Sequence, residues 1–405
     1  VHGRQETTDN SVARFETQEF IARMSEVQTT EGSALLNSVI SMLLRLGTVA
    51  VGLFSIAAGL LYAKQDSLLY FPEISGVPRR PSQNPRRFRS PEEYNLPFEN
   101  HLIPCEDGVS IHSWLLLQPH GKSRKAPTIV FFHGNAGNIG LRLPNAVQMY
   151  QHLGANVFLV EYRGYGDSDD TTPTEWGLKL DAEAALEFIL KHSEVDPESI
   201  FLFGRSLGGA VAFHLGQYAE KKEFPLAGIV VENTFLSISH MVDELMPFLA
   251  PFKLLVLRIG WNNHRVAPTL KTPVLYLAGD SDQLVPHSHM VELYQMSKAS
   301  SNGARIHVIK GGTHNESWLQ GGREYWDRFQ HFLSECLARE RSSSFRSSSS
   351  VVMEEIQLDD KPSTSVKMGG DTSTSSIPTM PNTFIDIARE ATTTSTNQNN
   401  DKKDK

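Results

Sequence analysis

The sequence contains few cysteines and carries no excess of positive charge. Its 405 residues include only two cysteines, Cys105 and Cys336. Two cysteines cannot build a disulfide framework or a cysteine-based zinc site. The formal net charge is −8 and the isoelectric point lies near 6.0, whereas nucleic-acid-binding domains usually present a basic face. These absences exclude a disulfide-stapled fold and indicate that nucleic acid is not a partner.

Two phosphate-binding signatures are also missing. Neither G-x-x-x-x-G-K-S/T nor G-x-G-x-x-G occurs in the chain, so no nucleotide-binding loop is predicted. The glycine-containing stretch YRGYGDS at 162–168 is therefore interpreted as a structural turn. No metal constellation and no cofactor site are predicted.

One long apolar run lies near the N-terminus. Residues 46–63 form 18 consecutive positions without a charged side chain. A helix rises about 1.5 Å per residue, so this run covers roughly 27 Å, close to the hydrocarbon thickness of a bilayer. We predict a single transmembrane helix over 34–63, after a flexible leader at 1–33 and before a linker at 64–97. A buried core helix or a signal peptide is the alternative, and the length of the run disfavours both.

The orientation of this helix is not decided by charge alone. Basic residues after the run, from Lys64 to Arg89, outnumber those before it. By the positive-inside rule this bias places the C-terminal side in the cytoplasm.

Short apolar runs alternate with helical patterns between residues 98 and 340. Six runs rich in Val, Ile, Leu and Phe predict strands buried on both faces, at 127–134, 155–166, 199–206, 226–234, 272–280 and 305–312. Helical patterns occupy 174–192, 207–222, 287–299 and 322–340. An Asp107-Gly108 turn predicts an antiparallel hairpin of 98–105 and 109–118. We therefore expect an α/β fold: a mostly parallel eight-stranded sheet with helices on both faces.

Two further segments differ from this alternation. Residues 235–270 are apolar and lie between two predicted strands, which favours a small helical cap over a ligand site; ordinary packing of helices on the sheet is the alternative. Residues 341–405 are rich in Ser and Thr with few apolar side chains, which predicts a disordered tail.

The candidate nucleophile is Ser206. It stands in Gly204-Arg205-Ser206-Leu207-Gly208, directly after a predicted buried strand and before a predicted helix that begins with small residues. A nucleophile at such a turn has strained backbone angles, and the neighbouring glycines avoid steric clashes. The helix N-terminus beside it favours developing negative charge. A small-residue turn without chemistry is the alternative interpretation.

A serine hydroxyl needs a base, and the base needs an acid to orient it. His314 is the candidate base because it immediately follows the last predicted strand. The loop after the preceding strand, 279–286, offers Asp282 and Asp280; Asp282 is preferred, because Asp280 follows Gly279 and is placed to brace the turn. Glu232, at the end of the strand before that, is a rival acid.

An oxyanion hole requires two backbone donors. The N–H of Leu207, directly after the nucleophile, is one candidate, and the N–H of Asn135, in the loop after the strand at 127–134, is the other. His133 in the same loop precedes the nucleophile in the chain. Because the base follows the nucleophile in this arrangement, we assign His133 a structural role.

The motifs FFHGNAGN, EYRGYGDS, GRSLGG, GDSDQLVP and GGTHN, in this order, resemble those of the α/β-hydrolase superfamily. With the apolar run ahead of them, they are similar to its membrane-anchored branch, the α/β-hydrolase domain-containing proteins, over residues 60–340. The resemblance implies Ser206, Asp282 and His314 as the charge-relay group. It also implies a type II orientation with a lumenal or extracellular domain, against the charge bias. Members include esterases, lipases and depalmitoylases, so no single substrate is implied.

The leading hypothesis is a membrane-anchored serine hydrolase that cleaves an ester or thioester of a lipid or acylated substrate. A serine peptidase would use the same residues. A non-catalytic scaffold on a hydrolase fold is the alternative of a different class, because a fold does not fix a function.

Overall fold

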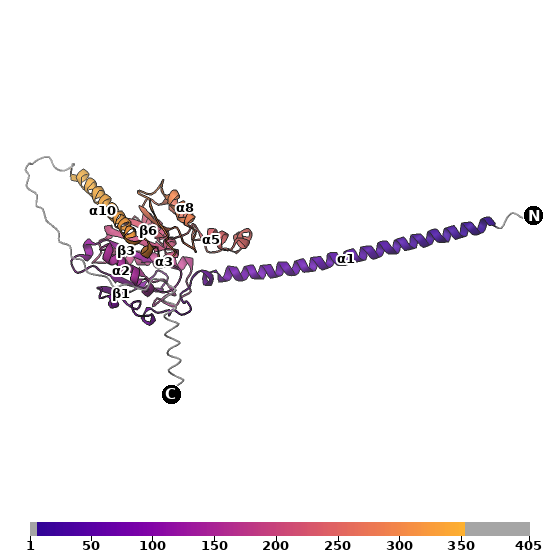
Figure 1. Ribbon diagram of the computed structural model, residues 1–405, viewed down its shortest axis with the longest axis horizontal. Coiled ribbons are helices and arrows are strands. Elements are labelled where there is room, and N and C mark those ends of the chain that lie inside the picture. The colour runs from indigo at the N-terminus through magenta and orange to yellow at the C-terminus, as the bar shows by residue number, and fades with distance from the viewer. Residues whose placement is uncertain (1–5, 353–405) are drawn as a thin grey trace, which may run out of the picture. The chain divides into compact units, whose positions relative to one another are not determined.

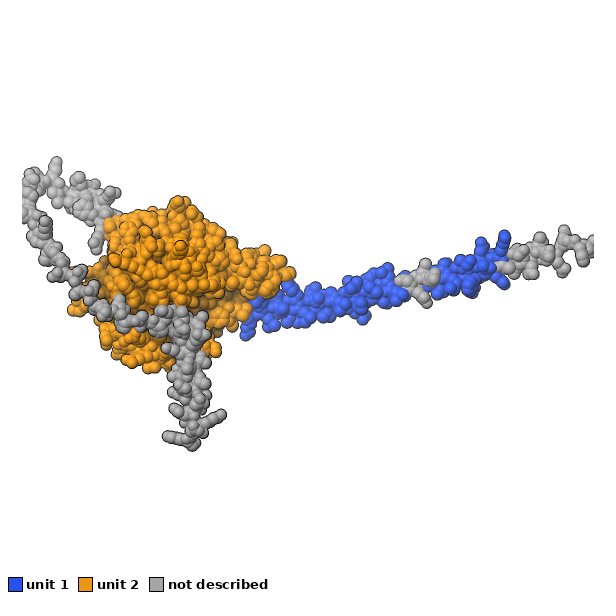
Figure 2. Space-filling model, viewed as in Figure 1, with its two compact units in different colours: residues 1–64 blue, residues 65–405 orange. Residues whose placement is uncertain are grey.

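The structure is a computed structural model that describes residues 6–352. The chain divides into two units, residues 1–64 and residues 65–405 (Figure 2). The last helix, α10 (Gly322–Val352), continues beyond residue 340, where the domain was predicted to end. The remainder of the predicted tail, from residue 353 onward, lies outside the described residues.

One helix, α1 (Glu6–Leu69), forms the described part of the first unit, and its last five residues belong to the second unit. Its segment Ser33–Leu69 is long and apolar enough to cross a membrane, and it contains the predicted span at 34–63. The leader at 1–33, predicted as flexible, is helical from Glu6 onward. No proline occurs before Pro72, so no residue of this segment interrupts the helix in the way that proline would.

The second unit begins at Gln65 and includes the segment predicted as a linker. Tyr70, Asn84 and Phe88 of that segment are buried, and the short helices η1 (Pro81–Gln83) and η2 (Pro91–Tyr94) lie within it. The basic residues of 79–89 concealed these buried positions, because they made the whole stretch look like a solvated connection.

Eight strands form one sheet in the order β1-β2-β4-β3-β5-β6-β7-β8. The strands are β1 (Phe98–Pro104), β2 (Ser110–Leu116), β3 (Thr128–Phe132), β4 (Asn156–Val160), β5 (Ile200–Arg205), β6 (Gly228–Glu232), β7 (Val274–Gly279) and β8 (Arg305–Ile309). β2 pairs antiparallel with β1 and with β4, and every other pair is parallel. The predicted fold class, with its antiparallel hairpin at the edge, is confirmed.

Helices cover both faces of this sheet (Figure 1). The apolar side chains of α3 (Glu175–Leu190), α4 (Leu207–Lys222) and α8 (His287–Ser297) join one core cluster, and those of α2 (Leu143–His152) and α10 join the other. Within β5, Leu202 faces the first cluster and Phe203 the second. Because both faces of the strand are buried, it reads as a continuous apolar run.

Two helical regions differ from the sequence-based prediction or refine it. α2 was not predicted, although its apolar residues have helical spacing and its Pro144 lies in the first turn, where proline is compatible with a helix. Between β6 and β7, where a cap was predicted at 235–270, the chain forms a series of short helices. These are α5 (Ile238–Leu245), η6 (Pro247–Phe252), α6 (Lys253–Val256), α7 (Asn263–Val266) and η7 (Ala267–Thr269).

Candidate active site

Ser206 stands at the sharp turn between β5 and α4. Its backbone angles are φ 54° and ψ −118°, a conformation that costs a non-glycine residue about 1–3 kcal/mol. The turn is closed by two hydrogen bonds: Ser206 N–H donates to the Glu232 carbonyl at 2.9 Å, and Thr234 Oγ1 donates to the Ser206 carbonyl at 2.7 Å. The surrounding fold therefore holds the strained serine in place.

The two glycines of the elbow are required by close backbone contacts. A Cβ at Gly204 would lie 2.0 Å from the Gly208 carbonyl oxygen, and one at Gly208 would lie 2.0 Å from the Phe132 carbonyl oxygen. No side chain fits at either distance. β3, β5 and α4 approach one another so closely because both positions lack a Cβ.

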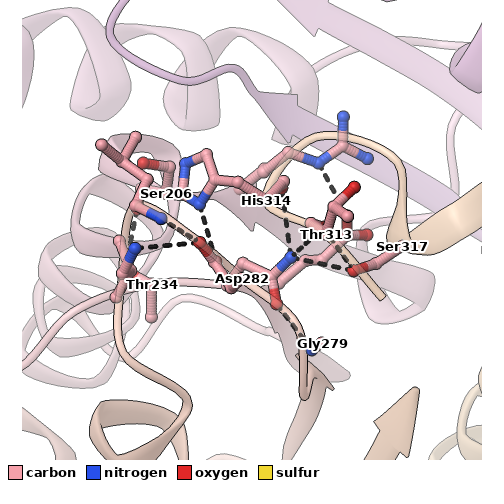
Figure 3. A network of polar contacts seen from close by, with 12 residues as sticks. Ser206, Thr234, Gly279, Asp282, Thr313, His314 and Ser317 are labelled. Carbon is pink, nitrogen blue, oxygen red and sulfur yellow. Dashed lines mark hydrogen bonds and ion pairs between the residues drawn. The ribbon is translucent and has the colours of Figure 1, made fainter. Parts of the chain in front are cut away.

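His314 and Asp282 are joined directly. The His314 Nδ1–Asp282 Oδ2 distance is 2.7 Å, and both side chains are almost fully buried. Asp282 Oδ1 also accepts hydrogen bonds from the backbone N–H groups of Leu284 at 2.8 Å and Val285 at 2.9 Å. Figure 3 shows these two side chains together with Ser206. With its Nδ1–H directed to Asp282, the imidazole keeps the lone pair of Nε2 for accepting a proton.

Among the described side chains, no hydrogen bond joins Ser206 Oγ to His314 Nε2. Such bonds are often long in ligand-free sites and tighten when substrate binds. Ser206 is bonded to Glu232 and Thr234, and Asn233 between them is bonded to the carbonyl of His314.

Asn233 is the residue that sequence reasoning missed. Its Oδ1 accepts from Gly279 N–H at 2.8 Å, and its Nδ2 donates to the carbonyls of Thr313 at 3.0 Å and His314 at 3.1 Å. The side chain is buried, and the backbone has a φ of 48°. Asn233 thus ties the end of β6 to the loops that carry Asp282 and His314. Its position directly after a buried strand was the available signal, since asparagine tolerates positive φ.

The two rival acids make other contacts. Asp280 Oδ1 accepts from Gly311 N–H at 2.7 Å, which lowers the pKa of that carboxyl, so it braces the loop as expected. Glu232 Oε1 pairs with Arg205 Nε at 2.7 Å, and its other oxygen accepts from the Tyr325 hydroxyl. Neither contacts His314 by a hydrogen bond or ion pair.

The candidate oxyanion donors lie on two adjacent segments. Leu207 is the first residue of α4, and the first N–H groups of a helix have no acceptor within the helix. Asn135 follows β3, and a Cβ at the neighbouring Gly134 would lie 3.8 Å from Ser206 Cβ. The loop of Asn135 therefore passes beside the serine.

That loop is fastened to the segment after α1. Phe71 N–H donates to the Asn135 carbonyl at 2.8 Å, and Gly137 N–H donates to the Phe71 carbonyl at 3.1 Å. The Tyr165 hydroxyl also donates to the Asn135 carbonyl, at 2.7 Å. These bonds fix the backbone on both sides of Asn135.

His133 lies beneath the loop, away from solvent. Its Nε2 is 3.1 Å from Glu161 Oε1, and both side chains are fully buried. Burial lowers the pKa of His133 although Glu161 acts in the opposite direction. Glu161 Oε2 also accepts from Ile139 N–H at 2.9 Å. These contacts agree with the structural role expected for His133.

Comparison with known proteins places this geometry in a family. Residues 127–258 match a family model described as the alpha/beta hydrolase fold. The chain is 35% identical to the alpha/beta hydrolase domain-containing protein WAV2 of Arabidopsis thaliana over 301 residues, which cover 72% of this chain and 94% of the relative. The chain belongs to the α/β-hydrolase family.

Two further proteins are similar to this chain. A Saccharomyces cerevisiae protein named as a membrane protein, YNL320W, is 32% identical over 287 residues, covering 70% of this chain and 94% of the relative. The solved structure of the Pyrococcus furiosus esterase Pf2001 aligns with a TM-score of 0.51 at 20% identity, covering 64% of this chain and 98% of that one. The structural match shows the shared hydrolase fold.

A second polar cluster, not predicted from the sequence, lies at the β1 edge of this hydrolase fold. Glu99 Oε2 is 2.9 Å from Nε2 of both His101 and His192, an arrangement that could hold a metal ion. However, His192 Nδ1 accepts a hydrogen bond from Glu194 N–H at 3.3 Å. That bond places the proton of the neutral ring on Nε2, which favours donation to Glu99 over metal ligation. β1 is separated from β5 by three strands, so the cluster is not part of the Ser206 site.

Proposed function

We propose that this α/β-hydrolase is a membrane-anchored serine hydrolase that cleaves an ester or thioester through an acyl-enzyme on Ser206. The observation that carries the proposal is the buried His314–Asp282 pair at 2.7 Å, assembled at the same sheet edge as a serine held at φ 54°. A base oriented by an acid beside a strained nucleophile is the arrangement that activates a serine hydroxyl.

The reaction proceeds in two acyl transfers. His314 Nε2 takes the proton of Ser206 Oγ as the oxygen attacks the carbonyl carbon, and the N–H groups of Leu207 and Asn135 stabilise the oxyanion. The carbon–oxygen or carbon–sulfur bond then breaks, and His314 gives its proton to the departing alcohol or thiol. Water, deprotonated by His314, attacks the acyl-enzyme and releases the carboxylic acid with Ser206 regenerated.

Two features support a lipid or acylated substrate: the membrane-compatible segment Ser33–Leu69 and the apolar chain between β6 and β7. An enzyme held at a bilayer meets lipids and acylated proteins at high local concentration. We propose one of these as the substrate, with the chain anchored by a single span in a type II orientation.

Protease protection of the C-terminal tail in sealed vesicles tests the orientation: a lumenal domain is protected, and a cytoplasmic one is digested.

A fluorophosphonate probe tests the enzyme proposal. The full chain in its membrane should be labelled, Ser206→Ala should not, and Ser281→Ala, a nearby exposed serine, should label like the wild type. Absence of labelling in the wild type under native conditions would favour the non-catalytic scaffold. A panel of esters, thioesters and amides of increasing acyl length then separates an esterase or thioesterase from a peptidase.

A further inference from the structure

The short helices between β6 and β7 expose large apolar side chains to solvent. Leu254 is 94% exposed and Phe248 is 71% exposed. Four more large apolar side chains on the same eleven-residue stretch are exposed. Together these six form what we call the apolar cap surface: Leu245, Met246, Phe248, Phe252, Leu254 and Leu255. Contiguous exposed apolar residues of this kind mark a binding surface for protein or membrane.

This surface is almost free of charge. From Leu245 to Leu255 the one charged residue is Lys253, and its ammonium group is paired with Asp243. The pair supplies the counter-charge within the cap itself. Transfer of the surface into an apolar phase therefore carries little cost from an uncompensated charge.

The cap is bonded to the end of the apolar helix α1. Gln65 Oε1 accepts from Arg258 N–H at 2.8 Å and from Ile259 N–H at 3.1 Å, and its Nε2 donates to the Val256 carbonyl. The Arg258 guanidinium also pairs with Asp66. The chain that directly follows the apolar cap surface is thus attached to the last turns of α1.

We infer that the apolar cap surface is seated in the interfacial region of the lipid bilayer that α1 crosses. This inference rests on the proposed membrane anchor. Gln65 follows the uncharged run 46–63 by two residues, a rise of about 3 Å along a helix, so it lies where the span leaves the hydrocarbon. A segment bonded to Gln65 lies at the same level, and interfacial segments bury their apolar face by about 5–10 Å at that level.

A bilayer explains the surface better than a second copy or a soluble partner. The attachment to Gln65 and Asp66 brings the membrane to this surface in every molecule, without an additional association step.

Site-specific fluorescence on the full chain tests this inference. Both native cysteines are buried, and burial raises the pKa of the Cys105 thiol to about 12, so an added exposed cysteine is labelled selectively. Leu254→Cys carries an environment-sensitive dye, and Leu102→Cys, 65% exposed on the edge strand β1, is the matched control. Both proteins are reconstituted into phosphatidylcholine vesicles with and without lipids that carry a quencher on the acyl chain.

The dye at Leu254→Cys should emit at shorter wavelength and be quenched several-fold more strongly by the acyl-chain quencher than the dye at Leu102→Cys. Equal quenching at the two positions would overturn the inference. A second result would also overturn it: emission from Leu254→Cys shifts to shorter wavelength as the protein-to-lipid ratio rises, and the quencher has no effect. That result would favour contact between copies of the chain.

Two independent measurements separate this result from the proposed function. Resistance of both labelled proteins to carbonate extraction reports the anchor, and fluorophosphonate labelling of both reports the serine hydrolase. With these intact, a failure of quenching at Leu254→Cys concerns the apolar cap surface alone.

Discussion

The side-chain amide of Asn135 donates a hydrogen bond of 2.9 Å to the carbonyl of Leu69, the last residue of α1. Carbonyl groups in the last turn of a helix have no partner within it and must find one elsewhere. Here the partner comes from the loop that passes beside Ser206. The helix end and the candidate oxyanion loop therefore satisfy each other, and the shape of the loop depends on the segment that follows the apolar run.

Asn135→Ala should slow acyl transfer while the protein stays folded. The variant keeps the backbone N–H of Asn135 and the hydrogen bonds to its carbonyl, but it loses the side-chain bond to Leu69 that also holds the loop. Small displacements of a catalytic group cost up to about 100-fold in rate. The second-order rate constant of fluorophosphonate labelling measures this effect. Asn302→Ala, at an exposed asparagine, is the control; equal rates for Asn135→Ala and the control would contradict the role assigned to the loop.

The choice between the two aspartates gives a second prediction. Asp282→Asn should reduce labelling on the order of 10⁴-fold, because an amide stabilises the wrong tautomer of a base such as His314. Asp280→Asn should leave most of the reactivity, because that side chain contacts Gly311 and not the imidazole. If Asp280→Asn were the more damaging change, the assignment of the acid would be wrong.

The strained backbone angles of Ser206 predict that this residue lowers the stability of the folded protein while it supplies the nucleophile. Ser206→Gly and Ser206→Ala should both be unreactive, but the glycine variant should be more stable by about 1 kcal/mol, because glycine adopts a φ of 54° without steric cost. For a domain of this size that difference raises the melting temperature by about 2–4 °C. Thermal unfolding of the two variants side by side measures it, and identical melting temperatures would show that the turn is relaxed.

Histidines whose rings are wholly or partly buried predict loss of stability in acid. Burial lowers the pKa of six of them: His112, His133, His214, His240, His289 and His307. Below about pH 6.5 these histidines bind more protons in the unfolded chain than in the folded chain. Each such proton lowers the free energy of unfolding by about 1.4 kcal/mol per pH unit. The free energy of unfolding is therefore not reduced by these histidines above about pH 6.5, and it decreases as the pH falls below that value.

One carboxyl acts in the opposite sense. Burial raises the pKa of Asp181 to about 6, so protonation below that pH relieves a cost of the folded state. With six groups against one, the melting temperature should fall between pH 7 and pH 5, and His112→Gln should make the fall less steep. A melting temperature that rises over this range would contradict the prediction.

The sequence predicted the parts of the fold that depend on local pattern. Strands such as β5 are buried on both faces and are visible as uninterrupted apolar runs, and the elbow is visible because close backbone contact leaves room for glycine alone at Gly204 and Gly208. The same patterns pointed to His314 and Asp282, which the structure joins at 2.7 Å. Their catalytic role stays a prediction until the variants are measured.

Contacts between distant parts of the chain could not be predicted in this way. Gln65 binds Ile259, and the Trp261 indole N–H donates to the Tyr70 hydroxyl at 3.0 Å, yet neither pairing has a local signature. The segment 64–97 was therefore predicted to be a linker. Asn233 was missed for the same reason, since its importance lies in joining two loops that are far from it in the sequence.

The bond between Tyr325 and Glu232 also has a consequence for the time at which the site is completed. Glu232 pairs with Arg205 beside the serine turn, and within residues 6–352 the hydrogen bond to its second oxygen comes from Tyr325 of α10. During synthesis the elbow is made well before this helix. The hydrogen bond from Tyr325 to Glu232 can therefore form only after residue 325 has left the ribosome. A nascent chain that ends before Tyr325 should therefore be unreactive towards the probe even though Ser206, Asp282 and His314 have all been made.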